Sequence, residues 1–224
     1  MYKMKKIFTL LFCIGLFGQN FNTTNFDIDS NFNIIQNQIT AEYKKRVINY
    51  AGNRYYFKKP QNALIFLFDG EKPINVQTNY NLLEQTFDID AENSKTLKLL
   101  SNKVSRVSFA EKNFISLKGK FYELITENEN FLLLADTFLE VYEPSYTAGI
   151  QEKPEPTYRR NNSLLLYVDN KMKKIERRKK FLLSMFSKNM SKEINSYMKK
   201  NKISPGDNED LSNLFLEFFD HLKF

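Results

Sequence analysis

A two-residue alternation of apolar and polar side chains, recurring between residues 43 and 142, is the feature that most constrains this fold. It is clearest at residues 74–81, INVQTNYN, where Ile74, Val76 and Tyr80 alternate with polar side chains. Successive side chains of a β-strand point to opposite faces, so this spacing predicts strands with one buried face. Short strands joined by short turns predict an antiparallel meander and argue against a parallel nucleotide-binding sheet.

Turn-forming residues separate these strand patterns. Asp69-Gly70 and Asn128-Glu129-Asn130 each follow or precede a dense apolar run, and Lys118-Gly119-Lys120 predicts a tight hairpin. Three prolines and a glycine interrupt the pattern over residues 143–162, which predicts a loop or linker. Beyond it, residues 163–168 and 171–176 are predicted to pair as a last hairpin.

The apolar spacing becomes helical after this hairpin. Two short helices are predicted around residues 181–186 and 194–198, and a third is predicted around 211–222. The third has the clearest spacing, with apolar side chains at Leu211, Leu214, Phe215, Phe218 and Leu222. We therefore predict an α+β fold, in which an antiparallel β-meander body, curved or sandwich-like, precedes a C-terminal bundle of three helices.

The first residues predict export. Lys3, Lys5 and Lys6 precede an apolar run over residues 7–17, and Gly18 and Gln19 follow it. This is the layout of a secretory signal peptide cleaved after residue 18 or 19. It predicts a product that is periplasmic or extracellular and that can lie peripheral to a membrane. The run is shorter than the roughly 20 residues that cross a bilayer, and no later stretch is long enough. Phe12 precedes Cys13 where a lipoprotein needs a small residue, so we expect Cys13 to leave with the signal.

The charge is distributed unevenly between three predicted parts of the chain. These are a signal peptide at 1–19, a β-rich body at 20–157, and a final β-hairpin with a basic helical tail at 158–224. Residues 158–224 hold 15 Lys and Arg against 8 Asp and Glu, a net charge of +7, whereas residues 19–157 have a net charge of −3. The chain is thus a mildly acidic body with a basic tail.

Several segments resemble a family of uncharacterised exported proteins of Bacteroidota. They include GNRYYF at 52–57, VQTNYN at 76–81, KKFL at 179–182 and EDL at 209–211. The resemblance covers most of the chain after the signal. It implies export and a β-then-α layout, and it implies no activity and no functional residues.

Residues typical of catalysis are scarce. His221 is the only histidine, and the mature chain has no cysteine, so no His, Cys or Ser nucleophile system is visible. Asp88 and Asp90 resemble the start of a calcium loop, but Asn93 and Leu99 stand where an EF-hand needs Gly and Glu. We therefore predict no metal and no cofactor. A pair of carboxylates that converges only in space, as in glycoside hydrolases, stays open.

One segment stands out by its charge, residues 171–180, KMKKIERRKK. Its seven cations against one glutamate, a net charge of +6, are Lys171, Lys173, Lys174, Arg177, Arg178, Lys179 and Lys180. Cations at the start of a helix oppose its dipole, so helix stability does not account for them. They form either a solvated face or a site for an anionic partner, such as lipid headgroups, lipopolysaccharide phosphates or an acidic protein surface.

These observations predict a non-enzymatic envelope or secreted binding module whose basic tail meets an anionic lipid or acidic envelope component. An alternative is a periplasmic carrier, because a curved sheet rich in the chain's 21 Phe and 12 Tyr can enclose a lipophilic ligand. A carboxylate-based hydrolase is a third alternative. Three short helices behind a basic segment also allow a helix-turn-helix, but export argues against a nucleic-acid partner.

Overall fold

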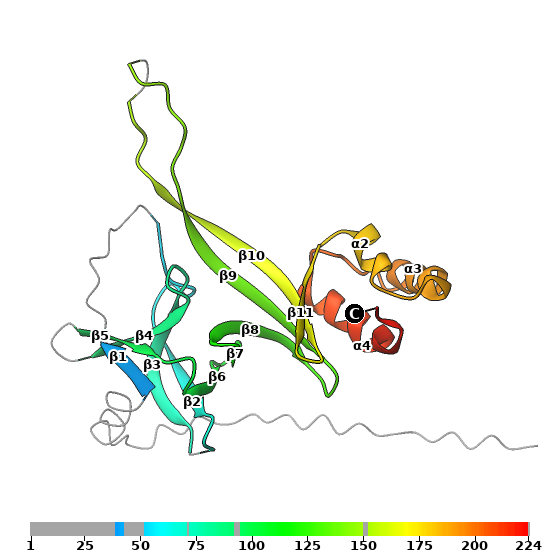
Figure 1. The fold of residues 1–224 in the computed structure, drawn as a ribbon, viewed down its shortest axis with the longest axis horizontal. Helices are drawn as coiled ribbons and strands as arrows, with labels where there is room; N and C mark the ends of the chain where they lie inside the picture. Colours follow the sequence, from blue (N-terminus) through cyan, green and yellow to red (C-terminus); the bar gives the residue numbers. More distant parts are fainter. Residues whose placement is uncertain (1–38, 43–51, 71, 92–94, 150–151, 224) are drawn as a thin grey trace, which may run out of the picture.

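The computed structural model describes residues 39–42, 52–70, 72–91, 95–149 and 152–223. In these residues an antiparallel sheet of eleven strands precedes short C-terminal helices, which confirms the predicted order of a β-rich body and helices (Figure 1). The strands are β1 Thr40–Glu42, β2 Gln61–Leu67, β3 Ile74–Asn81, β4 Thr86–Ala91, β5 Lys95–Leu99, β6 Val104–Ser108, β7 Asn113–Leu117, β8 Lys120–Glu127, β9 Leu132–Tyr142, β10 Thr157–Val168 and β11 Lys171–Ile175. The helices are α2 Lys179–Ser184, α3 Ser191–Lys200 and α4 Asn208–Phe218, with single 3₁₀ turns η3 Lys188–Met190 and η4 Phe219–His221.

The sheet bends at β3. Its strand order is β1-β5-β4-β3-β2-β6-β7-β8-β9-β10-β11. The first part of β3 pairs with β2 from Ile74 to Thr78, and the remainder pairs with β4. The amide of Leu139 in β9 donates a hydrogen bond to the carbonyl of Leu82 at 3.0 Å, just after β3 ends. The bend thus brings β9 back against β3, although four strands separate them in the sheet order.

Two tight hairpins follow the predicted turn chemistry. Lys118 and Gly119 have φ of 53° and 79°, and Asp169 and Asn170 have φ of 47° and 64°. Two successive residues with positive φ are the requirement of a type I′ turn, whose twist matches that of the flanking strands. Both predicted hairpins, β7–β8 and β10–β11, are confirmed.

The strand β10 begins earlier than the sequence pattern predicted. It pairs with β9 from Thr157 onward, so residues 157–162 belong to the sheet and the predicted loop at 143–162 is too long at its C-terminal end. The sequence RRNN at 159–162 lacks apolar alternation, and the ladder to β9 supplies the order that this stretch does not encode locally. The predicted boundary at 157/158 falls at the start of this strand, and the sheet continues across it.

Aromatic side chains fill the core inside the bend. Tyr80, Phe87, Phe114 and Phe121 are each at most 2% exposed. The ring of Phe87 lies 4.9 Å from that of Tyr80, 5.2 Å from Phe114 and 5.0 Å from Phe121. Such pairs add about 0.5–1.5 kcal/mol each beyond the burial of their surface. The interior of the curved sheet is therefore occupied by packed rings.

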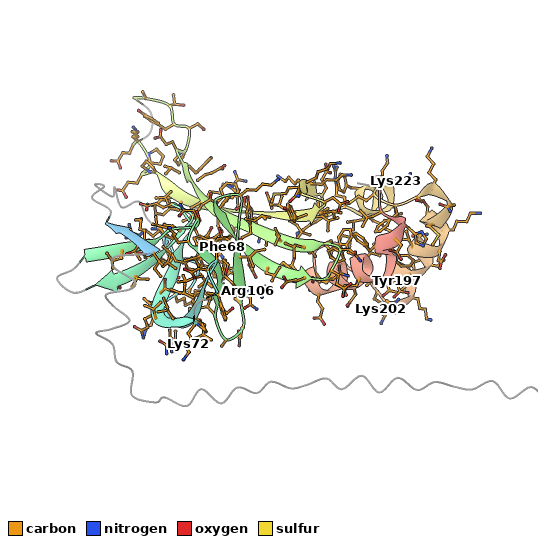
Figure 2. The ribbon with its side chains drawn as sticks, turned by 60° about the horizontal axis from the view of Figure 1, so that its bottom comes forward. Phe68, Lys72, Arg106, Tyr197, Lys202 and Lys223 are labelled. Atoms are coloured by element: carbon orange, nitrogen blue, oxygen red, sulfur yellow. The ribbon has the colours of Figure 1, made fainter. Side chains whose placement is uncertain are left out.

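A second core joins the helices to the other end of the sheet. Leu133, Leu164 and Leu166 of β9 and β10 form one cluster with Leu182 of α2 and Phe215 of α4. The helices gather beside the end of β9, β10 and β11 in Figure 1. In Figure 2, Tyr197 and Lys202 mark this helical end, and Phe68 and Lys72 lie on the bent part of the sheet.

Candidate functional site

The seven predicted anion-binding cations run from β11 to the first residues of α2. Strand β11 is the last in the sheet order, so its outer side is an edge. Because side chains alternate along a strand, Lys171 and Lys173 share the face of Ile175, which packs in the helical core, and Lys174 lies on the opposite face. The structure therefore divides the three cations of β11 between two faces of the sheet, and the other four follow this strand.

Three of these cations make contacts within the chain. Arg177 donates from Nη1 to the carbonyl of Gly206 at 2.8 Å and from Nη2 to Oδ1 of Asn208 at 2.6 Å. It thereby fixes the loop that leads into α4. Arg178 pairs with Glu176, and Nζ of Lys173 donates to the carbonyl of Lys223 at 3.3 Å. These contacts give Arg177 a structural role that the charge count alone did not reveal.

The side chains of Lys171, Lys174, Lys179 and Lys180 are exposed and project from the edge strand and the start of α2. Arg178, the residue before this helix, makes no side-chain cap, and the first turn of α2 holds no acidic residue. The helix dipole is thus opposed rather than complemented, as the sequence predicted. Lysines on an edge strand also discourage the addition of another strand, which is a structural use for Lys171 and Lys174.

A buried polar cluster around Asp88 was not anticipated as a site. Its side chain is 4% exposed, and Oδ2 accepts hydrogen bonds from Nδ2 of Asn81 at 2.8 Å and from the Tyr55 hydroxyl at 3.2 Å. Nζ of Lys98 lies 3.5 Å from Oδ1 and also pairs with Glu84. The cluster ties β4 to β3, to β5 and to the segment before β2.

Burial governs the electrostatics of this cluster. Desolvation raises the pKa of Asp88 above its ordinary range, and the hydrogen bonds from Asn81 and Tyr55 oppose this only in part. Desolvation likewise raises the pKa of the Tyr55 hydroxyl. Two carboxylates do converge here, those of Glu84 and Asp88, but they converge on the ammonium of Lys98. An ammonium held between two carboxylates links β4 and β5 to the turn after β3, which gives these carboxylates a structural role.

A second buried carboxylate, that of Glu123, is held in the same way. Its Oε2 accepts from the Tyr56 hydroxyl at 2.8 Å, and its Oε1 pairs with Nζ of Lys112 at 2.5 Å. The guanidinium of Arg160 lies 4.9 Å from the centre of the Tyr56 ring. Desolvation, followed by the negative charge of Glu123, raises the pKa of Tyr56.

The segment GNRYYF at 52–57 provides the partners of both buried carboxylates. Tyr55 binds Asp88, Tyr56 binds Glu123, and the backbone of Phe57 exchanges two hydrogen bonds with the Asn79 amide at 3.1 Å and 3.0 Å. The only sequence signal for this role was two adjacent tyrosines in a segment without apolar alternation. The segment therefore closes the bent sheet by satisfying its buried polar groups.

The remaining candidates for catalysis and metal binding lie in two different elements, η4 and β4. His221 lies in η4, where its carbonyl accepts from the Ser187 amide at 2.9 Å. Within the described ranges, no group of three or more His, Cys, Asp or Glu side chains is placed to hold a metal ion. Asp88 and Asp90 belong to β4, and Asn93 lies outside the described residues.

Comparisons with protein-family models, with curated proteins and with solved structures gave no match to this chain. In the part of the chain that the structure describes, no helix has the length and apolar character needed to cross a membrane. The predicted signal peptide at 1–19, with Cys13, lies outside the described residues.

Proposed function

We propose that this protein is an exported, non-enzymatic binding module that attaches to an anionic surface through four exposed lysines. The observation that carries the proposal is the exposure of Lys171, Lys174, Lys179 and Lys180 where the sheet edge meets α2. A lysine near an anionic membrane contributes about 1 kcal/mol of binding free energy, so four together suffice for peripheral attachment.

The filled interior supports a binding module over a lipid carrier. A carrier needs an apolar interior that its ligand can occupy. Here Tyr80, Phe87, Phe114 and Phe121 pack against one another inside the bend, and the three helices pack on the other end of the sheet. The lysine bridge between Glu84 and Asp88 likewise weighs against a carboxylate-based hydrolase.

Co-sedimentation with vesicles tests the proposal. We expect the chain from residue 20 to sediment with vesicles that contain phosphatidylglycerol and to stay in solution with phosphatidylcholine vesicles. Replacing Lys171, Lys174, Lys179 and Lys180 with Gln should weaken attachment by about tenfold or more, because each lost charge removes part of the attraction. Attachment should also fall as salt is raised.

The matched control removes the same charge elsewhere. Lys58, Lys59, Lys72 and Lys103 are exposed on the body, so their replacement with Gln changes the net charge equally. Equal weakening by both sets would mean that only net charge matters. Full attachment of the first variant would contradict the proposal.

A further inference from the structure

One face of the sheet carries an apolar surface opposite the helices. Its centre is formed by Ile115, Tyr122 and Leu134, which are 9%, 9% and 0% exposed. Six half-buried side chains surround this centre: Leu117, Leu124, Leu132, Leu165, Tyr167 and Met172. We call these nine residues the helix-free face.

The helix-free face is a single layer. Leu124 pairs with Leu134, which pairs with Leu165, so the three lie side by side across β8, β9 and β10. Every residue of this cluster belongs to one of the strands β7 to β11, and among the described residues no side chain of a helix joins it. Sheets normally bury an apolar face against a second layer. Among the described residues, none of the helices supplies such a layer on this face.

Positive charge surrounds the helix-free face. Nζ of Lys118 lies 5.6 Å from the centre of the Tyr167 ring, and Lys174 is the register partner of Leu165. Two ion pairs also border the face, Arg106 with Glu127 at 2.7 Å and Lys120 with Asp136 at 2.6 Å. Four cations against two carboxylates leave the border with a net charge of +2.

The connection between β9 and β10 is aromatic and negatively charged, so it complements the helix-free face. We call residues 141–149 and 152–157 the arm, which projects away from the rest of the molecule in Figure 1. Val141, Tyr142 and Tyr146 are 39%, 49% and 41% exposed there. Glu143, Glu152 and Glu155 against Lys153 give the arm a net charge of −2.

We propose that the arm of one copy docks on the helix-free face of a second copy, so that the chain assembles head to tail. The tyrosines of the arm cover the half-buried side chains around the apolar centre, and its glutamates meet Lys118 and Lys174. One contact then accounts for both surfaces, the apolar face that no described helix covers and the exposed aromatic arm. The opposite net charges of the two surfaces favour this contact.

The geometry of β9 requires that the two surfaces come from different copies. The arm continues from Tyr142 at one end of β9, and the helix-free face includes Leu132 at the other end. The 11 residues of this strand span about 35 Å, so an arm that leads away from the sheet does not reach its own face. Two helix-free faces packed on each other would bring their lysines together, which disfavours a symmetric dimer.

Two surface variants of the chain from residue 20 test this proposal by analytical ultracentrifugation. The arm variant carries Tyr142→Ser, Tyr146→Ser and Glu143→Lys, and the face variant carries Lys118→Glu and Met172→Glu. We expect the average mass of the unmodified chain to rise with concentration. Each variant alone should remain a monomer, because it lacks one of the two surfaces.

Mixing the variants gives the decisive result. The arm variant keeps its face and the face variant keeps its arm, so an equimolar mixture should form a one-to-one dimer that grows no further. A control with Phe68→Ser and Lys72→Glu, which changes the exposed residues labelled on the bent part of the sheet in Figure 2, should assemble like the unmodified chain. Circular dichroism must show the same fold for all four proteins.

Three results would overturn the proposal. The first is an unmodified chain that is monomeric at every concentration, and the second is assembly that persists in both variants. The third is a face variant that assembles normally and loses its attachment to phosphatidylglycerol vesicles. That last result would assign the helix-free face to a lipid surface, and it would also contradict attachment through the four lysines alone, because the face variant keeps all four.

Discussion

At the residue scale, burial distinguishes the charged side chains that stabilise the fold from those that are exposed to a binding partner. Asp88 and Glu123 are 4% and 5% exposed, and each is held by a tyrosine hydroxyl and a lysine ammonium. Burying a carboxylate costs free energy unless hydrogen bonds and an opposite charge offset the loss of water. These two residues are therefore expected to influence stability, whereas the exposed lysines of 171–180 can be exchanged with little effect on the fold.

Replacing Asp88 with Asn should change how stability depends on pH. The pKa of Asp88 is raised in the folded protein above its ordinary value of 3.8. Its stabilising contribution is thus fully present below that value and is lost as the pH rises through the raised pKa. Relative to the unmodified chain, Asp88→Asn should therefore gain free energy of unfolding as the pH rises above about 4. Urea unfolding at several pH values measures this difference.

Asp90→Asn is the matched control for this experiment. Asp90 lies two residues along the same strand, and its side chain is exposed. For Asp90→Asn, the plot of unfolding free energy against pH should be parallel to that of the unmodified chain. Parallel curves for both variants would contradict a raised pKa at Asp88.

At the element scale, the sequence predicted the turns and helices that neighbouring residues specify by themselves. Lys118-Gly119 and Asp169-Asn170 specify their turns by positive φ, and the helical spacing in 211–218 marks α4. The extension of β10 to Thr157 depends on pairing with β9, a contact that no short window contains. The same holds for the candidate site. The seven cations are close in sequence, but alternation along β11 and the contacts of Arg177 divide them in space.

Helix α4 offers a direct test of capping. Oδ1 of Asp207 accepts from the amides of Glu209 at 2.8 Å and Asp210 at 3.0 Å, which satisfies two of the donors that a helix start leaves free. Asp207→Ala should lower the free energy of unfolding by about 1 kcal/mol. Glu217→Ala removes an exposed carboxylate from the same helix and should have little effect in thermal or urea unfolding. An equal loss in both variants would show that the cap contributes nothing specific.

At the scale of the whole molecule, the sheet has two ends with different roles. The bent end is closed by packed rings and by two buried carboxylates, and the other end carries the helices and the exposed lysines. Strands β9 and β10 run between these regions and extend beyond them into the arm (Figure 1). The surfaces that we assign to binding thus lie on a framework whose two buried carboxylates have partners of their own, so changing these surfaces should leave the fold intact.

The last prediction concerns the route by which this molecule reaches an anionic surface. When the full chain is expressed in a Gram-negative host, we expect residues 1–18 or 1–19 to be removed, because the basic start and the apolar run at 7–17 have the layout of a signal peptide. The intact mass of the protein from the periplasmic fraction measures the cleavage point. It also reports the loss of Cys13, which would leave a mature chain that can form no disulfide bond.

The control for export changes only the basic start. Lys3→Glu, Lys5→Glu and Lys6→Glu should keep the chain uncleaved and inside the cell, because the signal needs its positive end. A chain that is cleaved and exported despite these changes would show that another feature directs it. An unmodified chain that stays whole in the cytoplasm would contradict export. It would then favour duplex DNA over a lipid surface as the anionic partner of the lysines, and salt-dependent binding of DNA would distinguish the two.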